Sequence, residues 1–148
     1  MAARKHTPAD AGALAAGLLV DACRPHLEAS LRLQVISDLA LDLGRRLETL
    51  AGEDSADSLV EAALACADLA TLASCNLTAL PECVGHLATA TVHLAAGATR
   101  ALIPLVEAKA RTLDDAYAEN MLRDTRSARW RADLAARQIE DLQKGGTL

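Results

Sequence analysis

The stretch SCNLTALPECVGHLATATVHL, in the middle of the chain, holds the densest group of side chains able to do chemistry. Cys83, His86 and His93 are spaced by three and seven residues, so on a helix they project from nearly the same face. Sulfur and imidazole are ligands for zinc or copper, and Cys75 or Glu82 could complete such a site. In the structural alternative, the two histidines lie at a helix interface and hydrogen-bond a neighbour, while Cys83 packs as a small apolar group.

A second group is the acidic turn GEDSADS, whose Glu53, Asp54 and Asp57 could supply a general acid or base. The alternative is an ordinary solvated turn. The other common catalytic patterns are missing from the sequence: it has no G-x-S-x-G elbow, no Gly-rich phosphate loop, no H-E-x-x-H and no paired E-x-x-H. Nucleophilic serine, nucleotide and di-iron chemistry are therefore not indicated.

The composition predicts the elements that must position these groups. Apolar residues make up 51% of the 148 residues, mostly as alanine and leucine, with no phenylalanine, one tryptophan and one tyrosine. Alanine and leucine favour helices, whereas strands favour β-branched and aromatic side chains. The sequence therefore predicts a single all-α domain over residues 1–148.

Charge and cysteine usage narrow the class of protein further. A net charge of −5 argues against binding to nucleic acid and to an anionic membrane surface. The four cysteines show no C-x-x-C spacing, so neither a zinc ribbon nor a redox pair is indicated. We expect four buried, reduced thiols in a cytoplasmic protein.

Helix start and stop signals predict an up-and-down bundle of about five helices. The first has Thr7 as its cap, Pro8 at its first position and its end near Cys23, before an interruption at Arg24-Pro25. The other four are expected over 26–51, from Ser58-x-x-Glu61 to Cys75-Asn76, over 81–110 with a kink at Pro104, and from Thr112-x-x-Asp115 to Gly145-Gly146.

Two of the expected helices carry mostly small side chains, in the segments AGALAAG and HLATATVHLAAGATRA. Small residues let two helix backbones approach closely, either between subunits or inside one chain. Both arrangements are open from the sequence alone.

Several segments, taken in chain order, resemble the cyclodeaminase domain of formiminotransferase-cyclodeaminase and its stand-alone relatives, the methenyltetrahydrofolate cyclohydrolases. ALIPLVEAKARTLDDAYAENML is similar to the family's "N-x-x-I-N-L-K", turn and "D-E-x-F" segment. SCNLTALPECVGHLATA resembles its "G-N-x-N-x-x-S-D" turn, LETLAGEDSADSL its "L-A-x-x-D-x-x-A-F" helix end, and TPADAGALAAGLL its "T-P-G-G-G" start. The resemblance covers most of the chain.

The sequence departs from the family pattern at three places. The glycine triplet is replaced by Ala9-Asp10-Ala11, and the position of the Ser-Asp carboxylate is taken by Thr78-Ala79. The chain is also shortened between Asp57 and Cys75. Asp54 is the one acid or base that remains for hydrolysis of a cyclic amidinium.

The resemblance implies a homodimer that acts on or binds a folate-type one-carbon ligand, without a metal cofactor. It assigns catalysis to Asp54, in a cleft where we expect this side chain to be partly desolvated. The ligand-binding residues would be Thr7, Asp10 and Gly12 at the first helix start, with Asn76 and Thr78 at the later turn. The alternative is a non-catalytic member that binds a small molecule or a partner helix.

Overall fold

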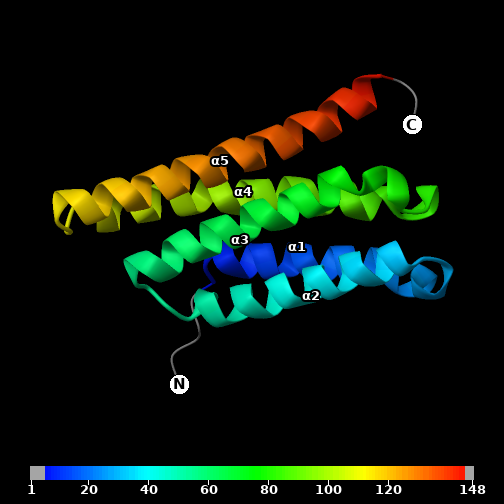
Figure 1. Cartoon of the computed structure of the whole chain (residues 1–148), viewed down its shortest axis with the longest axis horizontal. Helices are drawn as coiled ribbons and strands as arrows, with labels where there is room; N and C mark the ends of the chain where they lie inside the picture. Colours follow the sequence, from blue (N-terminus) through cyan, green and yellow to red (C-terminus); the bar gives the residue numbers. More distant parts are fainter. Residues whose placement is uncertain (1–5, 146–148) are drawn as a thin grey trace.

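The computed structural model describes residues 6–145, and in this range every regular element is helical (Figure 1). Five α-helices lie side by side with successive helices antiparallel, which confirms the all-α bundle predicted from the composition. They are α1 Pro8–Cys23, α2 Leu31–Ala51, α3 Ala56–Cys75, α4 Gly85–Ala110 and α5 Asp115–Lys144. Short 3-10 segments cover Arg24–Ala29, Leu77–Ala79 and Glu82–Val84.

Two helices begin later than predicted, because 3-10 turns occupy the residues in front of them. α2 starts at Leu31 rather than at residue 26, since the chain leaves α1 through the segment Arg24–Ala29 and becomes extended only at Ser30. α4 starts at Gly85 rather than at residue 81. Pro81 has an extended backbone with ψ 141°, and Glu82–Val84 then forms a 3-10 turn.

Two predicted caps are wrong by two or three residues. The cap of α3 is Ser55 rather than Ser58, because the Ser55 hydroxyl accepts a hydrogen bond from the Ser58 N–H at 3.1 Å. The cap of α5 is Asp114 rather than Thr112, because its carboxylate accepts from the Tyr117 N–H at 3.1 Å. The Thr112 hydroxyl instead donates to a carbonyl in the last turn of α4.

Two further predictions concern the kink of α4 at Pro104 and the end of α5 at Gly145-Gly146. α4 continues through Pro104 to Ala110, although a proline removes one backbone donor and favours a bend. The predicted kink at Pro104 stays a prediction. α5 ends at Lys144 with Gly145 as its C-cap, and Gly146 lies outside the described residues.

α3 is the central helix, and it contacts each of the other four. It is also the one described helix that is long and apolar enough to cross a membrane by length and composition, with a mean hydropathy of 1.4. Within the bundle, 67% of that window is buried by protein. Neighbouring helices thus cover the apolar surface of α3, as expected for the core helix of a bundle.

Small side chains set the spacing between the helices. α1 and α4 pack against each other within one chain, and the buried Thr91 hydroxyl on α4 donates to the Ala15 carbonyl on α1 at 3.2 Å. Gly44 on α2 faces Ala16 on α1, where a Cβ at residue 44 would lie 3.0 Å from the Ala16 Cβ. The small-residue faces of α1 and α4 therefore meet inside one chain, which was one of the two open arrangements.

The cysteines divide into two pairs. Cys23 and Cys66 are buried, whereas Cys75 and Cys83 are exposed, so the expectation of four buried thiols is wrong for the second pair. The reason is position, because Cys75 is the last residue of α3 and Cys83 lies in the 3-10 turn before α4.

Candidate functional site

The start of α1, the α2–α3 turn, the first turns of α3 and the C-terminal half of α4 line a cavity of about 410 Å³. We call it the Thr7–Asp54 cleft, after the two predicted site residues on its wall. Its apolar side is formed by leucines from three helices, and its polar side by the acidic turn. The lining residues are Thr7, Ala9, Leu50, Ala51, Gly52, Glu53, Asp54, Ser58, Leu59, Ala62, Leu102 and Leu105.

Asp54 lies at the rim of this cleft and is not desolvated. Its side chain is 85% exposed, and the carboxylate pairs with the Lys109 ammonium on α4 at 3.2 Å. The expected partial desolvation is therefore wrong. Asp54 is therefore a solvated carboxylate beside the Lys109 ammonium. A carboxylate in this position can accept a proton or attract a positively charged ligand.

Glu53 is held more firmly than Asp54. Its carboxylate accepts a short hydrogen bond from the hydroxyl of Ser58, which is buried in the first turn of α3. The Ser55 hydroxyl in turn donates to the Ser58 oxygen at 2.7 Å. The sequence groups Glu53 with Asp54 as one acidic turn. Nothing in the pattern indicates that Glu53 makes the ordered contacts in the cleft.

Asp57 contacts a different helix from Asp54. Its carboxylate accepts a short hydrogen bond from the hydroxyl of Tyr117 on α5. This hydrogen bond raises the pKa of the Tyr117 phenol, with smaller contributions from desolvation and from the charge of Asp57. Asp57 therefore joins the starts of α3 and α5 and is not on the wall of the cleft.

Asp10 and Gly12, the other two predicted site residues at the start of α1, contact the protein's own helices. The Asp10 carboxylate accepts a hydrogen bond from the Thr7 N–H at 2.7 Å and closes a capping box. Gly12 is buried, where a Cβ atom would lie 2.5 Å from the Cys66 sulfur and 3.1 Å from a methyl group of Leu47. The predicted ligand contact of Gly12 is wrong, because this residue faces the core.

Asn76 and Thr78 lie at the other end of α3. Twenty helical residues separate them from Asp54, a span of about 30 Å at 1.5 Å per residue. The Asn76 amide accepts two hydrogen bonds from the Arg32 guanidinium, at 3.0 and 2.8 Å, and donates one to the Leu72 carbonyl. The predicted convergence of all these residues on one pocket is therefore wrong.

Thr78 lines a different cavity, of about 620 Å³, between the turn after α3 and the first turns of α4. His86 is also on its wall, together with Glu82 and with Gln143 from the end of α5. His93 lies two turns further along α4 and is exposed. In the described part of the chain, no group of three His, Cys, Asp or Glu side chains could hold a metal ion.

The interface alternative for the Cys83, His86 and His93 face is also wrong, because all three residues are exposed. Cys83 has a neighbour that the sequence did not indicate. Its sulfur lies 4.0 Å from the Nε2 atom of His26, which belongs to the 3-10 segment after α1. The contact joins the two short turns at this end of the bundle.

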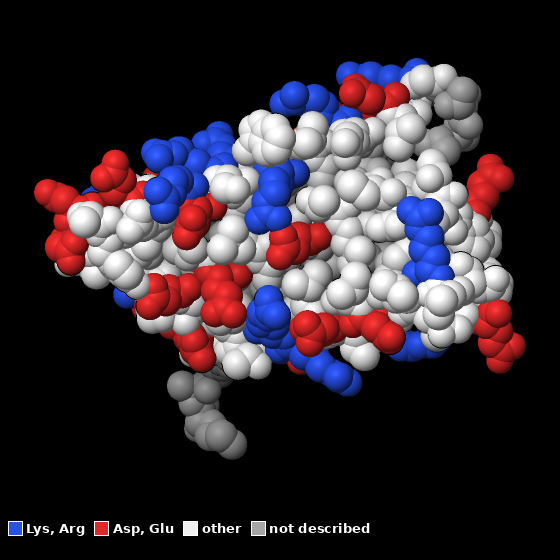
Figure 2. Space-filling model, in the orientation of Figure 1, with Lys and Arg blue, Asp and Glu red and all other residues white. Residues whose placement is uncertain are grey.

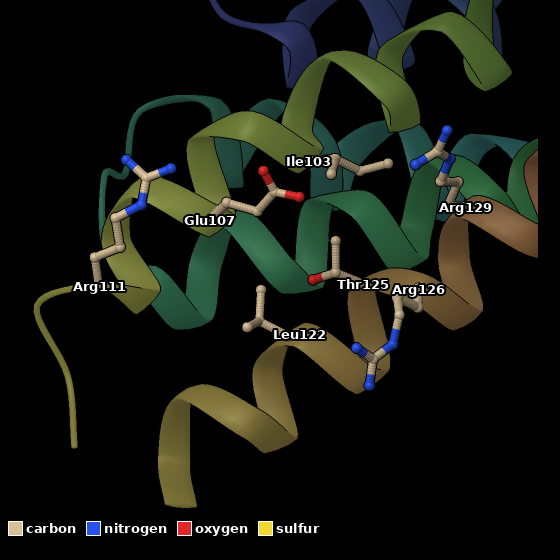
Figure 3. Close-up of a pocket in the computed structure, with 7 residues that line it drawn as sticks. All are labelled: Ile103, Glu107, Arg111, Leu122, Thr125, Arg126 and Arg129. Atoms are coloured by element: carbon tan, nitrogen blue, oxygen red, sulfur yellow. The ribbon is translucent and has the colours of Figure 1, made fainter. Parts of the chain in front are cut away.

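A further cavity, of about 340 Å³, lies between α4 and α5 (Figure 3). Figure 3 shows the Glu107 carboxylate between the guanidinium groups of Arg111 on one side and Arg129 on the other. Arg126 lies on the α5 side, and its side chain turns outward. The floor is Ile103, Leu122 and Thr125. The sequence pattern does not single out these arginines, because they are spread along two charge-rich segments.

Fold and cavities together define an all-α, five-helix bundle with a cleft of mixed polar and apolar lining at each end and one between α4 and α5. No family model matches the chain, and no curated protein matches it. The function must therefore be inferred from the geometry of the chain's own residues.

Proposed function

We propose that the chain binds a folate-type one-carbon compound in the Thr7–Asp54 cleft, as the cyclodeaminase resemblance implies. The observation that carries this proposal is that Thr7 and Asp54, which lie far apart in the sequence, line one cavity. Its volume of about 410 Å³ falls within the range of small-molecule sites, roughly 300–1,000 Å³. Cytoplasmic location, predicted from the reduced cysteines, belongs to this proposal.

The chemistry of the wall suits such a ligand. Leu105, which is 42% exposed, offers the accessible apolar surface for a flat ring system, and the largely buried Leu50 and Leu59 lie on the same wall. Glu53 and Asp54 provide negative charge for the amidinium cation of methenyltetrahydrofolate. In the enzymatic version of the proposal, Asp54 accepts a proton from the water that attacks the amidinium carbon. One ring C–N bond then breaks and leaves a formyl group, which makes the chain a cyclohydrolase. As a cyclodeaminase, the chain would instead act on a formimino group, whose carbon is attacked by the second folate nitrogen and loses ammonia, with Asp54 carrying the proton. In the binding version, the same cleft holds the ligand without turnover.

The test follows the absorbance of methenyltetrahydrofolate after the protein is added. We expect Asp54→Asn to abolish any hydrolysis above that in buffer, while Asp141→Asn, at the far end of α5, leaves the rate unchanged. Hydrolysis no faster than in buffer excludes the enzymatic version. Calorimetric titration with tetrahydrofolate then decides whether binding remains, and no heat from either wild type or variant overturns the proposal.

A second candidate function is assembly as a partner-binding homodimer, which the family resemblance also implies. It is favoured by Leu31, Val35 and Leu39, which follow one another at four-residue spacing on the outer face of α2. Their exposed fractions are 75%, 49% and 48%, large values for a stripe of aliphatic side chains. A second copy could bury this stripe.

Light scattering tests the dimer at micromolar concentration. We expect wild type at twice the 15.5 kDa chain mass, and Val35→Glu/Leu39→Glu at the mass of a single chain. Asp38→Arg/Asp42→Arg, on the same outer face, is the control for a change that removes no apolar surface. A wild-type particle of 15.5 kDa at all concentrations contradicts the dimer.

A further inference from the structure

The middle of α5 is basic in a chain that is acidic overall. Residues 123–137 contain five arginines and two aspartates, whereas the whole chain has a net charge of −5. Figure 2 shows Lys and Arg side chains gathered over much of α5, Asp and Glu side chains over the α2–α3 turn, and charges of both signs along α2. The middle of α5 is therefore a local concentration of positive charge.

Some of these arginines are neutralised by neighbours. Arg131 pairs with Asp68 on α3, and Asp133 is shared by Arg129 and by Arg100 on α4. Arg111 and Arg126 are different, because neither makes an ion pair with any residue between 6 and 145. Their charges are available to an external anion.

Trp130 lies beside these free charges. It is the only tryptophan in the sequence, and 66% of its surface is exposed. Because Arg126 is four residues before it on α5, the two side chains share one face of the helix. Tryptophan and arginine are the residues most enriched among the energetic centres of protein interfaces. An exposed tryptophan next to an unpaired arginine therefore indicates a docking surface.

The cavity between α4 and α5 adjoins this face and adds depth to it. Arg126 and Arg129 belong to both, and the floor of Ile103 and Leu122 is apolar. Its volume of about 340 Å³ is enough to accommodate a side chain of a partner. Glu107 also lies in the cavity, so a carboxylate that entered would be attracted by three arginines and repelled by one glutamate.

We propose that Arg111, Arg126, Arg129 and Trp130 dock an acidic segment of a partner protein. A carboxylate of that segment pairs with the guanidinium groups around the cavity, and an apolar side chain next to it packs on the Trp130 ring. Nucleic acid is a poorer match, because Glu107, Asp124 and Asp133 interrupt the basic face and would repel a continuous row of phosphates. This proposal is independent of the Thr7–Asp54 cleft.

Trp130 fluorescence is the readout, since no other tryptophan contributes. The probe is the acetylated, amidated peptide with the sequence Glu-Asp-Glu-Leu-Glu-Asp-Glu, and the control peptide replaces every acid by its amide. We expect a saturable change of Trp130 emission with the acidic peptide alone, and weaker binding as salt is raised.

Matched variants locate the contact. Arg126→Gln/Arg129→Gln should weaken peptide binding about tenfold, the loss expected for two partly exposed charge pairs. Arg45→Gln/Lys144→Gln makes the same change in net charge elsewhere and should alter the affinity by less than about twofold. Glu107→Gln should tighten binding, because it removes the one repulsive carboxylate. Circular dichroism confirms that each variant is folded.

Four results would overturn the proposal. The first is no saturable change of Trp130 emission at millimolar peptide, and the second is that the amide peptide binds as tightly as the acidic peptide. The third is that the two double variants lose the same peptide affinity, and the fourth is that an oligouridylate of the same charge binds more tightly than the acidic peptide. The last result would identify the face as a nucleic-acid surface instead.

Discussion

Gly12 on α1 faces Cys66 on α3 so closely that a Cβ atom at residue 12 would lie 2.5 Å from the sulfur. We expect Gly12→Ala to lower the free energy of unfolding by about 1–3 kcal/mol, because the added methyl group overpacks a full core. Gly17→Ala is the control, since a Cβ there meets no atom within 4 Å. It should stabilise the protein by about 0.5–1 kcal/mol through helix propensity. Urea denaturation measures both, and equal effects would contradict the close contact.

The thiols should react in two classes. Cys75 and Cys83 are exposed and should be modified by Ellman's reagent in the folded protein, whereas Cys23 and Cys66 should react only after unfolding in urea. Burial raises the pKa of the thiol at both protected positions, which further slows their reaction. Four thiols titrated at once in the native protein would show that the α1–α3 contact opens readily.

The pH dependence of stability should report on Cys66. Burial raises the pKa of this thiol from its ordinary value of 9.0 to about 12 in the folded protein. Between these values the unfolded chain loses the proton and the folded chain keeps it. The contribution of Cys66 is therefore complete below pH 9 and decreases as the pH rises, by about 1.4 kcal/mol per pH unit.

The Cys66→Ala variant isolates this effect from other groups that titrate in alkali. Unfolding free energies of wild type and variant should converge or cross between pH 9 and about pH 10.5, because only the wild type carries the Cys66 contribution. Parallel profiles over this interval would mean that the thiol is not held neutral by burial.

Asn76 should contribute to the stability of the fold and not to ligand binding in the Thr7–Asp54 cleft. Its amide joins Arg32 at the start of α2 to the last turn of α3. Asn76→Ala should therefore lower the unfolding free energy by about 0.5–1.5 kcal/mol, the usual net contribution of such hydrogen bonds. Calorimetric titration with tetrahydrofolate should be unchanged, because the cleft lies at the other end of α3. A weakened ligand affinity without loss of stability would support the ligand role predicted from the sequence.

The sequence predicted the fold because many independent signals agreed. Alanine and leucine dominate, Thr7-Pro8 starts α1, and α1 and α3 end where they were expected, at Cys23 and Cys75. The errors lie at helix starts. The hydroxyl of Ser55 and the carboxylate of Asp114 compete with nearby candidates for the same cap, and spacing alone does not rank them.

The site was less predictable than the fold, because residue types do not show where in the bundle each side chain lies or which neighbour it contacts. Asp54 and Asn76 belong to turns that follow one another in the sequence, yet a straight helix holds them at opposite ends of the bundle. Glu53 and Asp54 look alike in sequence, but one binds the buried Ser58 and the other pairs with Lys109 in solvent. Only the packing of α3 and α4 distinguishes them.

α2 packs mainly against α1, and this arrangement has a consequence for how the chain folds. The hairpin of α1 and α2 and the unit of α3, α4 and α5 are each built from neighbours in sequence, so each can form early through local contacts. Joining them requires partners such as Thr91 and Ala15, which are 76 positions apart. Docking of the hairpin should therefore be the slow, late step, and the amides of α2 should exchange with solvent before those of α3.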